Sequence, residues 1–244
     1  MLFKASIFVM IAFIHNVHSH GESDDHGGER CLEGPFHKTS PSPEGPDYNE
    51  CFSWKNKSCC TAEFTQELRA NKSVNIYNFH WDHCGPISQP CEQFIKDEEC
   101  FYQCEPELIK YQHPDPDKKR MAHKVPICAD YCNQWFDACM YDRTCVSNWQ
   151  SDFHYIDEVY KCPNNTICRT YQDMYRDGRG LCNNMWGQSF YYEDKGYCMV
   201  MKFDPTTGNP NIRTGVNTGS CLKTLWHSSL AIVMAMLMEY IDRL

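Results

Sequence analysis

The sequence lacks the short motifs that mark common enzyme active sites. It contains no Gly-x-Ser-x-Gly nucleophile turn, no His-Glu-x-x-His zinc motif and no glycine-rich loop for a phosphate. No nucleophile with a base and an orienting partner can be assembled from what remains. We therefore predict a binding protein rather than an enzyme, with no catalytic residues, no metal ligands and no cofactor.

Positive charge is also scarce. The chain has 23 Lys and Arg against 32 Asp and Glu, a net charge of −9 and an isoelectric point near 5.6. Such a chain binds phosphate groups poorly, so nucleic acid is not expected as a partner. There are also no internal repeats and no linker that would divide the chain, which favours one domain and a monomer.

No apolar run at the N-terminus is long enough to cross a bilayer. The run Ala5–Ile14 follows Lys4 and precedes the small residues around Ser19, the order of a secretory signal peptide. The alternative, a membrane span, would need about 20 apolar residues. We therefore assign residues 1–19 to a signal peptide and expect the polar leader at 20–30, rich in acidic residues and histidine, to be disordered.

Cysteine is the residue that the sequence has in excess. All 17 cysteines follow the predicted signal peptide, which is typical of an oxidised, disulfide-stabilised extracellular domain. Three Asn-x-Ser/Thr sequons, at Asn56, Asn71 and Asn164, indicate glycosylation in the same compartment. Zinc binding by the cysteines is disfavoured, because an oxidising compartment converts thiols into disulfides.

The odd cysteine, Cys221, stands apart from the other sixteen. Small residues precede it at 217–220, and an apolar run, Leu230–Met238, follows a short spacer. This order resembles a lipid-anchor signal, in which the chain is cut near Gly219 and the tail is removed. We therefore assign 212–229 to a linker with an anchor-attachment region and 230–244 to a removable hydrophobic tail. The alternative is a secreted protein that ends in an amphipathic helix, with Cys221 free or paired between chains.

The remaining sequence predicts a small α+β domain at 31–211, with several helices, short strands and long loops. Cys128–Cys139 places Trp135 and Phe136 on one apolar helix face. Proline and glycine predict a loop at 31–47. Further helices are expected at 62–70, 89–108 and 181–186, and a strand is expected at 197–203, followed by a turn at 204–208.

Aromatic residues lie near polar groups in many places, which is typical of a pocket for a flat conjugated ring. The candidates are Tyr77, Phe79, Trp81, Phe101, Tyr102, Trp149, Phe153, Tyr155, Trp186 and Phe190. Singly, each is as well explained by packing in a core. Two ring faces stacked on a ligand would each add on the order of 1 kcal/mol beyond the burial of apolar area.

Several sequence segments between residues 31 and 211 resemble sequences of the folate receptor and riboflavin-binding protein family. "CLEGPFHKTSPSPEG", "CFYQC" and "MWGQSF" are similar to the riboflavin-binding branch, and "FHWDHCG", "CVSNW" and "FDPTTGNPN" to the folate receptor branch. The sixteen cysteines come in the same order. Since sixteen cysteines allow about two million pairings, spacing alone does not choose among them.

The resemblance implies eight disulfides and a ligand site. The implied pairs are Cys31–Cys59, Cys51–Cys100, Cys60–Cys104, Cys84–Cys168, Cys91–Cys139, Cys128–Cys198, Cys132–Cys182 and Cys145–Cys162. The ligand's ring is expected between Tyr102 and Trp186, with Ser189 as a hydrogen-bonding partner. The alternative is that Tyr102 and Trp186 simply pack on each other. The full predicted set is Tyr102, Trp186, Glu98, Ser189, Tyr77, Phe79, Phe153, Tyr155 and Lys118.

The identity of the ring stays open between riboflavin, folate and neither. Glu98 stands where folate receptors have an aspartate that holds the pterin. Their tryptophan and two arginines that grip the glutamate tail become Asp117, Lys118 and Met121. Lysine does not offer the bidentate fork that a carboxylate prefers, and riboflavin needs no such clamp. A histidine and two tryptophans of folate receptors become Gln150, Phe153 and Tyr155.

The function that the resemblance implies is an extracellular vitamin receptor or carrier for uptake or transport. The alternative is an adhesion receptor on the same scaffold that has lost its small ligand. Glu98, with nearby histidines such as His154, also suggests a pH dependence, since protonation of a ligand-binding carboxylate would weaken binding.

Overall fold

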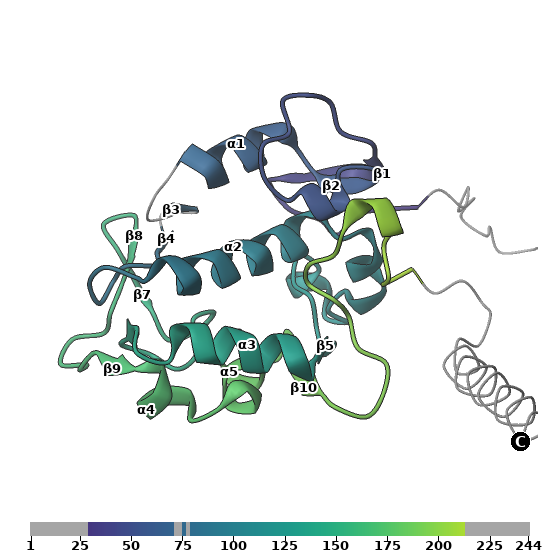
Figure 1. Ribbon diagram of the computed structural model, residues 1–244. Helices are drawn as coiled ribbons and strands as arrows, with labels where there is room; N and C mark the ends of the chain where they lie inside the picture. The colour runs from purple at the N-terminus through teal and green to yellow at the C-terminus, as the bar shows by residue number, and fades with distance from the viewer. Residues whose placement is uncertain (1–28, 71–74, 77–78, 213–244) are drawn as a thin grey trace, which may run out of the picture.

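The computed structural model describes residues 29–70, 75–76 and 79–212 (Figure 1). The predicted signal peptide, most of the leader, Cys221, the C-terminal tail, Tyr77 and the sequon at Asn71 lie outside these residues. The helices are α1 (Ala62–Ala70), α2 (Gln89–Cys104), α3 (Ala129–Cys139), α4 (Tyr171–Tyr175) and α5 (Gly178–Asn184). Four 3₁₀ turns are η1 (Phe52–Trp54), η2 (Pro106–Tyr111), η3 (Pro116–Lys118) and η4 (Pro205–Thr207).

The strands of the described residues form five separate two-stranded pairs. These pairs are β1 (His37–Ser42) with β2 (Ser58–Cys60), β3 (Asn75–Ile76) with β4 (Phe79–His80), β5 (Val125–Cys128) with β10 (Phe190–Glu193), β6 (Arg143–Thr144) with β9 (Arg169–Thr170), and β7 (His154–Ile156) with β8 (Val159–Lys161). Only β5 and β10 are parallel. The predicted class, a small disulfide-rich α+β domain with short strands, is confirmed.

Helix α2 runs through the middle of the domain, beside α3 (Figure 1). It begins where the Ser88 side chain accepts a hydrogen bond from the backbone N–H of Cys91. The prediction that it continues to Leu108 was wrong. Pro106 has no N–H to donate and disfavours helical backbone at the preceding residue, so α2 ends at Cys104 and the chain continues as η2.

Helix α3 has the buried face that its spacing predicts. Trp135 is fully buried and Phe136 is nearly so. Helix α3 also packs closely against α5, where a Cβ on Gly178 would lie 2.7 Å from the Asn133 backbone. Helix α5 starts three residues before the predicted Leu181, because Asp177 caps it by accepting from the Gly180 N–H.

Two segments differ from their predicted structure. The strand expected at 197–203 was wrong: Met199 forms a single bridge to Ile127, and the next N–H, of Val200, donates to the Asn211 side chain. That side chain takes the hydrogen bond that a ladder would need. The loop expected at 31–47 contains β1, whose pairing with β2 is irregular in register.

The eight disulfides of the structure are the eight pairs that the family resemblance implies. Three of them join α2 to other segments: Cys91 to Cys139 on α3, Cys100 to Cys51 and Cys104 to Cys60. Each bridge stabilises the fold by roughly 2–4 kcal/mol, chiefly by restricting the unfolded chain. Helix α2 is therefore a fixed frame for the side chains that it carries.

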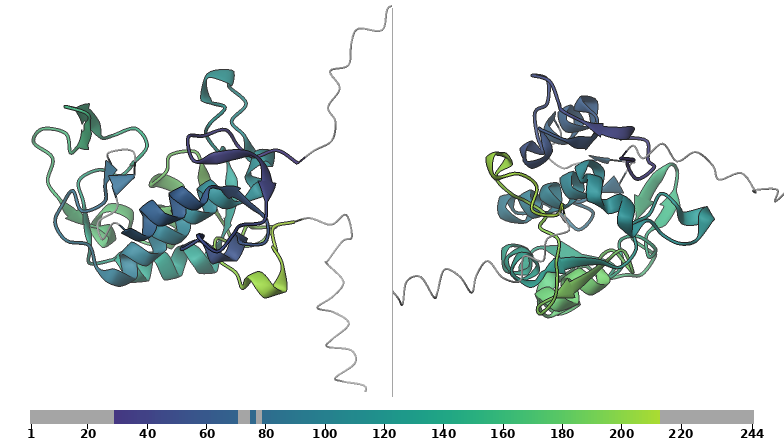
Figure 2. Two further views of the ribbon diagram at one scale, coloured as in Figure 1. Left: turned by 90° about the horizontal axis from the view of Figure 1, so that it is seen from above. Right: turned by 90° about the vertical axis from the view of Figure 1, so that its right-hand side faces the viewer.

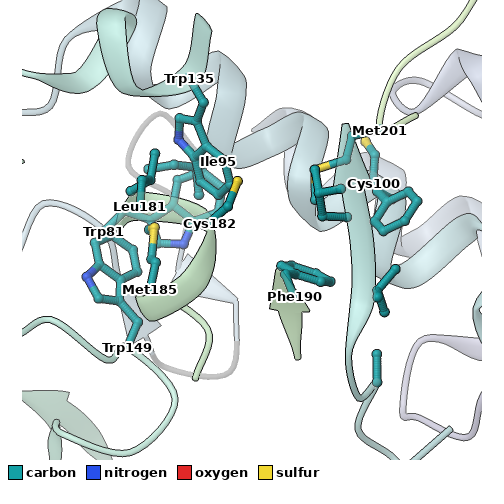
Figure 3. Close-up of a cluster of buried hydrophobic side chains, with 14 of the residues drawn as sticks. Trp81, Ile95, Cys100, Trp135, Trp149, Leu181, Cys182, Met185, Phe190 and Met201 are labelled. Atoms are coloured by element: carbon teal, nitrogen blue, oxygen red, sulfur yellow. The ribbon is translucent and has the colours of Figure 1, made fainter. Parts of the chain in front are cut away.

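The hydrophobic core joins these elements into one cluster. Figure 3 shows Trp135, Ile95, Leu181 and Cys182 together, with Met185 nearby. This part of the core takes its side chains from α2, α3 and α5, and α3 packs against the other two helices. It fixes the end of α5, from which the chain turns back toward α2.

The surface features bear on where the protein acts. The side chains of Asn56 and Asn164, two of the three sequon asparagines, are exposed. The two ends of the described range lie on one side of the domain, opposite the β7–β8 hairpin (Figure 1), and Figure 2 shows the same ends from two further directions. Within the described ranges, no helix combines the length and apolar character needed to span a membrane.

Candidate ligand-binding site

A cavity of about 300 Å³ opens between α2, the turn after α5 and the β7–β8 hairpin. Its lining is mostly aromatic, with a few polar groups, as in pockets for small flat ligands. The lining residues are Phe79, Glu98, Glu99, Tyr102, Trp149, Gln150, Tyr160, Trp186, Ser189 and Phe190. Five of the predicted ligand residues, Phe79, Glu98, Tyr102, Trp186 and Ser189, are among them.

Tyr102, on α2, is held by hydrogen bonds at its side-chain hydroxyl and at its backbone carbonyl. Its hydroxyl donates to the carbonyl oxygen of Arg120, and its own carbonyl accepts from Nε2 of His37 at 3.1 Å. The His37 ring also meets the Tyr102 ring edge-on, with centroids 5.8 Å apart. Tyr102 lies one turn after Glu98, so both side chains point from the same face of α2 into the cavity.

Trp186 follows the end of α5, in a turn that depends on Gly187. The φ of Gly187 is 59°, in the left-handed region, and a Cβ there would approach the side chains of Asn148 and Gln150 to 3.1 Å. The Trp186 carbonyl accepts from the N–H of Ser189, which places both residues on the cavity wall. The disulfide Cys132–Cys182 fixes the helix that precedes this turn.

The Tyr102 and Trp186 rings do not contact each other. The ring partner of Trp186 is Trp149, at 5.9 Å and 73°, and the ring partner of Tyr102 is His37. Both rings instead face the same cavity. The alternative in which the two rings simply pack together is therefore not the arrangement in this structure.

The indole rings of Trp149 and Trp186, which both line the cavity, differ in their hydrogen bonds. The Trp149 Nε1–H donates to the Thr144 hydroxyl at 3.0 Å. The Trp186 Nε1–H is buried and has no partner. Because an unpaired buried donor costs about 1–3 kcal/mol, the Trp186 indole is poised to donate to a bound group.

Two buried carboxyl groups from α2 face the cavity. Glu98 and Glu99 are 3% and 8% exposed. Burial, together with the charge of Glu99, raises the pKa of Glu98 well above its ordinary value, and its Oε2 has no hydrogen-bond partner. Burial raises the pKa of Glu99 to about 7, and a hydrogen bond from Gln103 opposes that rise. Burial in the cavity wall therefore shifts both groups toward the neutral acid form.

Ser189 and Gln150 complete the polar part of the lining. The Gln150 amide donates to the Ser189 hydroxyl at 3.2 Å, and Ser189 is buried. The Ser189 carbonyl accepts from the N–H of Val125, which ties this residue to the start of β5. Both side chains can exchange their mutual hydrogen bond for one to a ligand.

Several predicted residues lie elsewhere. Phe153 packs against Phe79, with centroids 4.9 Å apart, and supports the lining from behind. Tyr155 is 60% exposed and lies outside the cavity lining. Lys118 lines a separate cavity of about 180 Å³, and His154 is exposed on β7. None of these residues belongs to the lining of the main cavity, and the part of Phe153, Tyr155 and Lys118 in ligand binding stays a prediction.

The sequence interpretation missed Glu99 and Tyr160 as lining residues. Glu99 is adjacent to Glu98, so a pair of acidic residues on one helix was the available sign. Tyr160 gave no sign, because its position depends on how the hairpin folds back onto Phe79. Trp149 and Phe190 were included only in the broad aromatic group, and Gln150 only as a departure from folate receptors.

One cluster of metal-type ligands occurs in the described ranges. His83, Cys84, Cys145 and Cys162 place their donor atoms within 4.8 Å of one another. All three cysteines are in disulfides, to Cys168 and to each other. A disulfide sulfur is not a thiolate, so this cluster is not a zinc site.

Comparison with known proteins places this geometry in a family. The model of the folate receptor family matches residues 30–201. Human folate receptor gamma is 36% identical over 188 residues, 74% of this chain and 76% of the receptor. The riboflavin-binding protein of Dromaius novaehollandiae is 38% identical over 175 residues, 71% of each chain, and that of Gallus gallus is 36% identical over 174 residues. The chain belongs to the folate receptor family.

Proposed function

We propose that the protein binds a vitamin with a flat heterocyclic ring, riboflavin or folate, between Tyr102 and Trp186. The observation that carries this proposal is the aromatic cavity into which both rings face without touching each other. Relatives named folate receptor and riboflavin-binding protein support the same class of ligand. Binding then needs no catalytic group or cofactor.

The unpaired polar atoms of the cavity support a heterocycle rather than a hydrocarbon. Glu98 Oε2 and Trp186 Nε1 are buried without partners, one able to accept and the other able to donate. A ring bearing both N–H and C=O groups satisfies these atoms and removes their desolvation cost. Stacking on the two aromatic faces supplies the remaining affinity.

Riboflavin is the ligand that the charges favour. Its ring is neutral, and its imide edge presents one N–H between two carbonyl groups. A neutral carboxyl group, which the raised pKa of Glu98 favours, can donate to a carbonyl and accept from the N–H. Among the described residues, no arginine lines the cavity to clamp an anionic tail.

Folate remains the second candidate because of the neighbouring cavity. His113, Lys118 and His123 line it, and Gln150 and Ser189 line both cavities. A ligand bound at Trp186 could extend a carboxylate toward these basic side chains. Lysine would make a weaker, single contact than an arginine fork.

We further propose that the protein is extracellular and monomeric, and that its C-terminal segment anchors it to the outer face of the cell membrane. Eight disulfides and exposed asparagines at two sequons support an oxidising, glycosylating compartment. The described chain ends on the side opposite the β7–β8 hairpin (Figure 1). An anchor there would hold the hairpin side of the cavity away from the membrane. No observation on the described residues favours the adhesion alternative.

The direct test is a titration of the purified protein. Riboflavin fluorescence should be quenched on binding, and folate should be titrated in parallel by calorimetry. Tight, saturable binding of one ligand supports the proposal. Failure of both to bind more tightly than about 10 µM would refute it.

A further inference from the structure

The β7–β8 hairpin beside the cavity has a regular turn and is held by an ion pair and a disulfide. Its turn residues, Asp157 and Glu158, have φ of 52° and 63°, as the two central residues of a type I′ turn require. Lys161 pairs with Asp157 across the turn at 3.1 Å. The disulfide Cys145–Cys162 ties the base of the hairpin to the strand that precedes it.

The hairpin presents two tyrosines with different surroundings. Tyr155 and Tyr160 are directly paired across the strands, with ring centroids 4.9 Å apart. Tyr155 is 60% exposed and does not line the cavity. Tyr160 is 37% exposed and does line it, so its ring stands at the rim between cavity and solvent.

Tyr160 is also the outer end of a chain of edge-to-face contacts that leads to Trp186. Tyr160 meets Phe79 at 5.8 Å and 75°, and Phe79 meets Trp149 at 5.3 Å and 63°. Trp149 in turn meets Trp186 at 5.9 Å and 73°. All four rings line the cavity, so they form one continuous surface, which we call the aromatic wall.

We propose that Tyr160 is a ligand-contacting residue that makes the cavity selective for ligands with an extended apolar aromatic part. The inference rests on the proposed function and deepens it. The rings next to Tyr160 in the aromatic wall are apolar, so the ligand part that reaches Tyr160 gains contact area only if it is apolar as well. A three-ring flavin provides such a part in its benzenoid ring. A two-ring ribityl-lumazine, which lacks that ring, does not.

The experiment compares Tyr160→Ala with the matched control Tyr155→Ala. Both changes remove a tyrosine ring from the same hairpin, but only the first removes a ring from the cavity. Riboflavin should bind Tyr160→Ala about 5- to 10-fold more weakly than wild type, and Tyr155→Ala within about twofold. Tyr160→Phe, which keeps the ring, should also bind within about twofold.

The two-ring analogue supplies the selectivity readout. The affinity of the two-ring analogue should change by less than about twofold in Tyr160→Ala. The ratio of riboflavin affinity to analogue affinity should therefore fall nearly as much as the riboflavin affinity itself. Near-ultraviolet circular dichroism and the thermal midpoint should show that all three variants fold.

The outcomes separate the two claims. If wild type binds riboflavin and Tyr160→Ala behaves like Tyr155→Ala, the inference is overturned and the proposed function stands. An equal loss for riboflavin and its two-ring analogue also overturns it, because the contact would then not involve the apolar ring. If wild type binds neither vitamin, the proposed function and this inference fall together.

Discussion

Two buried acidic residues, Glu98 on α2 and Glu105 just after its end, differ in the hydrogen bonds that their carboxyl oxygens accept. They lie seven residues apart in the sequence. Glu98 and Glu105 are 3% and 2% exposed. Glu105 accepts from the Trp54 indole at 2.9 Å and from the side-chain amides of Asn209 and Asn211 at 2.8 and 2.7 Å. It also accepts from the backbone N–H of Glu107. Glu98 has an oxygen with no partner at all.

The difference separates Glu105, a structural acid, from Glu98, the acid that we propose binds the ligand. Glu105 joins η1, the end of α2 and the C-terminal segment at 209–211, so its hydrogen bonds close the fold. Native proteins satisfy nearly all of their buried polar groups, and the exceptions need an explanation. At Glu98 the explanation is the adjacent cavity, where a ligand would supply the missing partner.

The largest expected effect comes from removing the structural acid. Glu105→Ala removes the acceptor of the buried Trp54 indole and of the Asn209 amide, and one of the two acceptors of the buried Asn211 amide, so the free energy of unfolding should fall by about 3–5 kcal/mol. Urea denaturation of purified protein measures this change. Glu105→Gln, which keeps one acceptor oxygen, should lose less. A loss below about 1 kcal/mol for Glu105→Ala would contradict the structural role.

Removing one face of the proposed stack should affect binding rather than folding. Trp186→Ala should weaken the affinity for the vitamin by about 2–3 kcal/mol, roughly 30- to 150-fold. The core variant Trp135→Ala is the control, since it should reduce stability by about 3–5 kcal/mol. Fluorescence titration and thermal unfolding measure the two effects. Unchanged affinity in Trp186→Ala would remove the basis of the proposed site.

The buried acid pair, Glu98 and Glu99, should make the ligand-free protein more stable in mild acid. The pKa of Glu99 is about 7 in the folded protein and 4.5 as its ordinary value, so the folded state holds its proton more tightly. The free energy of unfolding should therefore fall as pH rises from about 4.5 to about 7. Glu99→Gln should remove about 2 kcal/mol of that fall. Identical pH profiles of wild type and Glu99→Gln would contradict this assignment.

The smallest predicted effect distinguishes the two vitamins. A pterin presents two N–H donors on one edge, which only a carboxylate accepts together, whereas a neutral acid is sufficient for the imide of riboflavin. Acidification through the raised pKa of Glu98 should therefore increase the preference for riboflavin over folate about 5- to 10-fold. Glu98→Gln should abolish the change. A preference that does not vary with pH in wild type would exclude Glu98 as the discriminating group.

Much of the local structure was accessible from residue patterns. The spacing of Trp135 and Phe136 predicted the buried face of α3, and the helix at 62–70 has the expected bounds. The errors occurred where a side chain or a proline competed with the backbone pattern. Pro106 ended α2 early, and the Asn211 side chain took the hydrogen bond of Val200 that a strand would have used.

The candidate site was less accessible, because its lining comes from distant segments. Tyr102 and Trp186 were identified only through a family resemblance, and nothing in their own surroundings in the sequence pairs them. Phe153 and Tyr155 are two residues apart, so they share one side of the chain, yet Phe153 lies behind the lining and Tyr155 faces solvent. Burial of a particular ring depends on what the rest of the chain places beside it.

By itself the sequence determined the disulfide-rich class and the buried face of α3. These follow from composition and from periodicities within about a dozen residues, where covalent geometry decides the outcome. Only the tertiary structure decided that Tyr160 reaches the cavity, that Lys118 does not, and that Glu105 is saturated while Glu98 is left unpaired. The hydrogen bonds of Glu105 and the contact of Tyr160 with Phe79 join segments that are far apart in the sequence, and no local pattern encodes them.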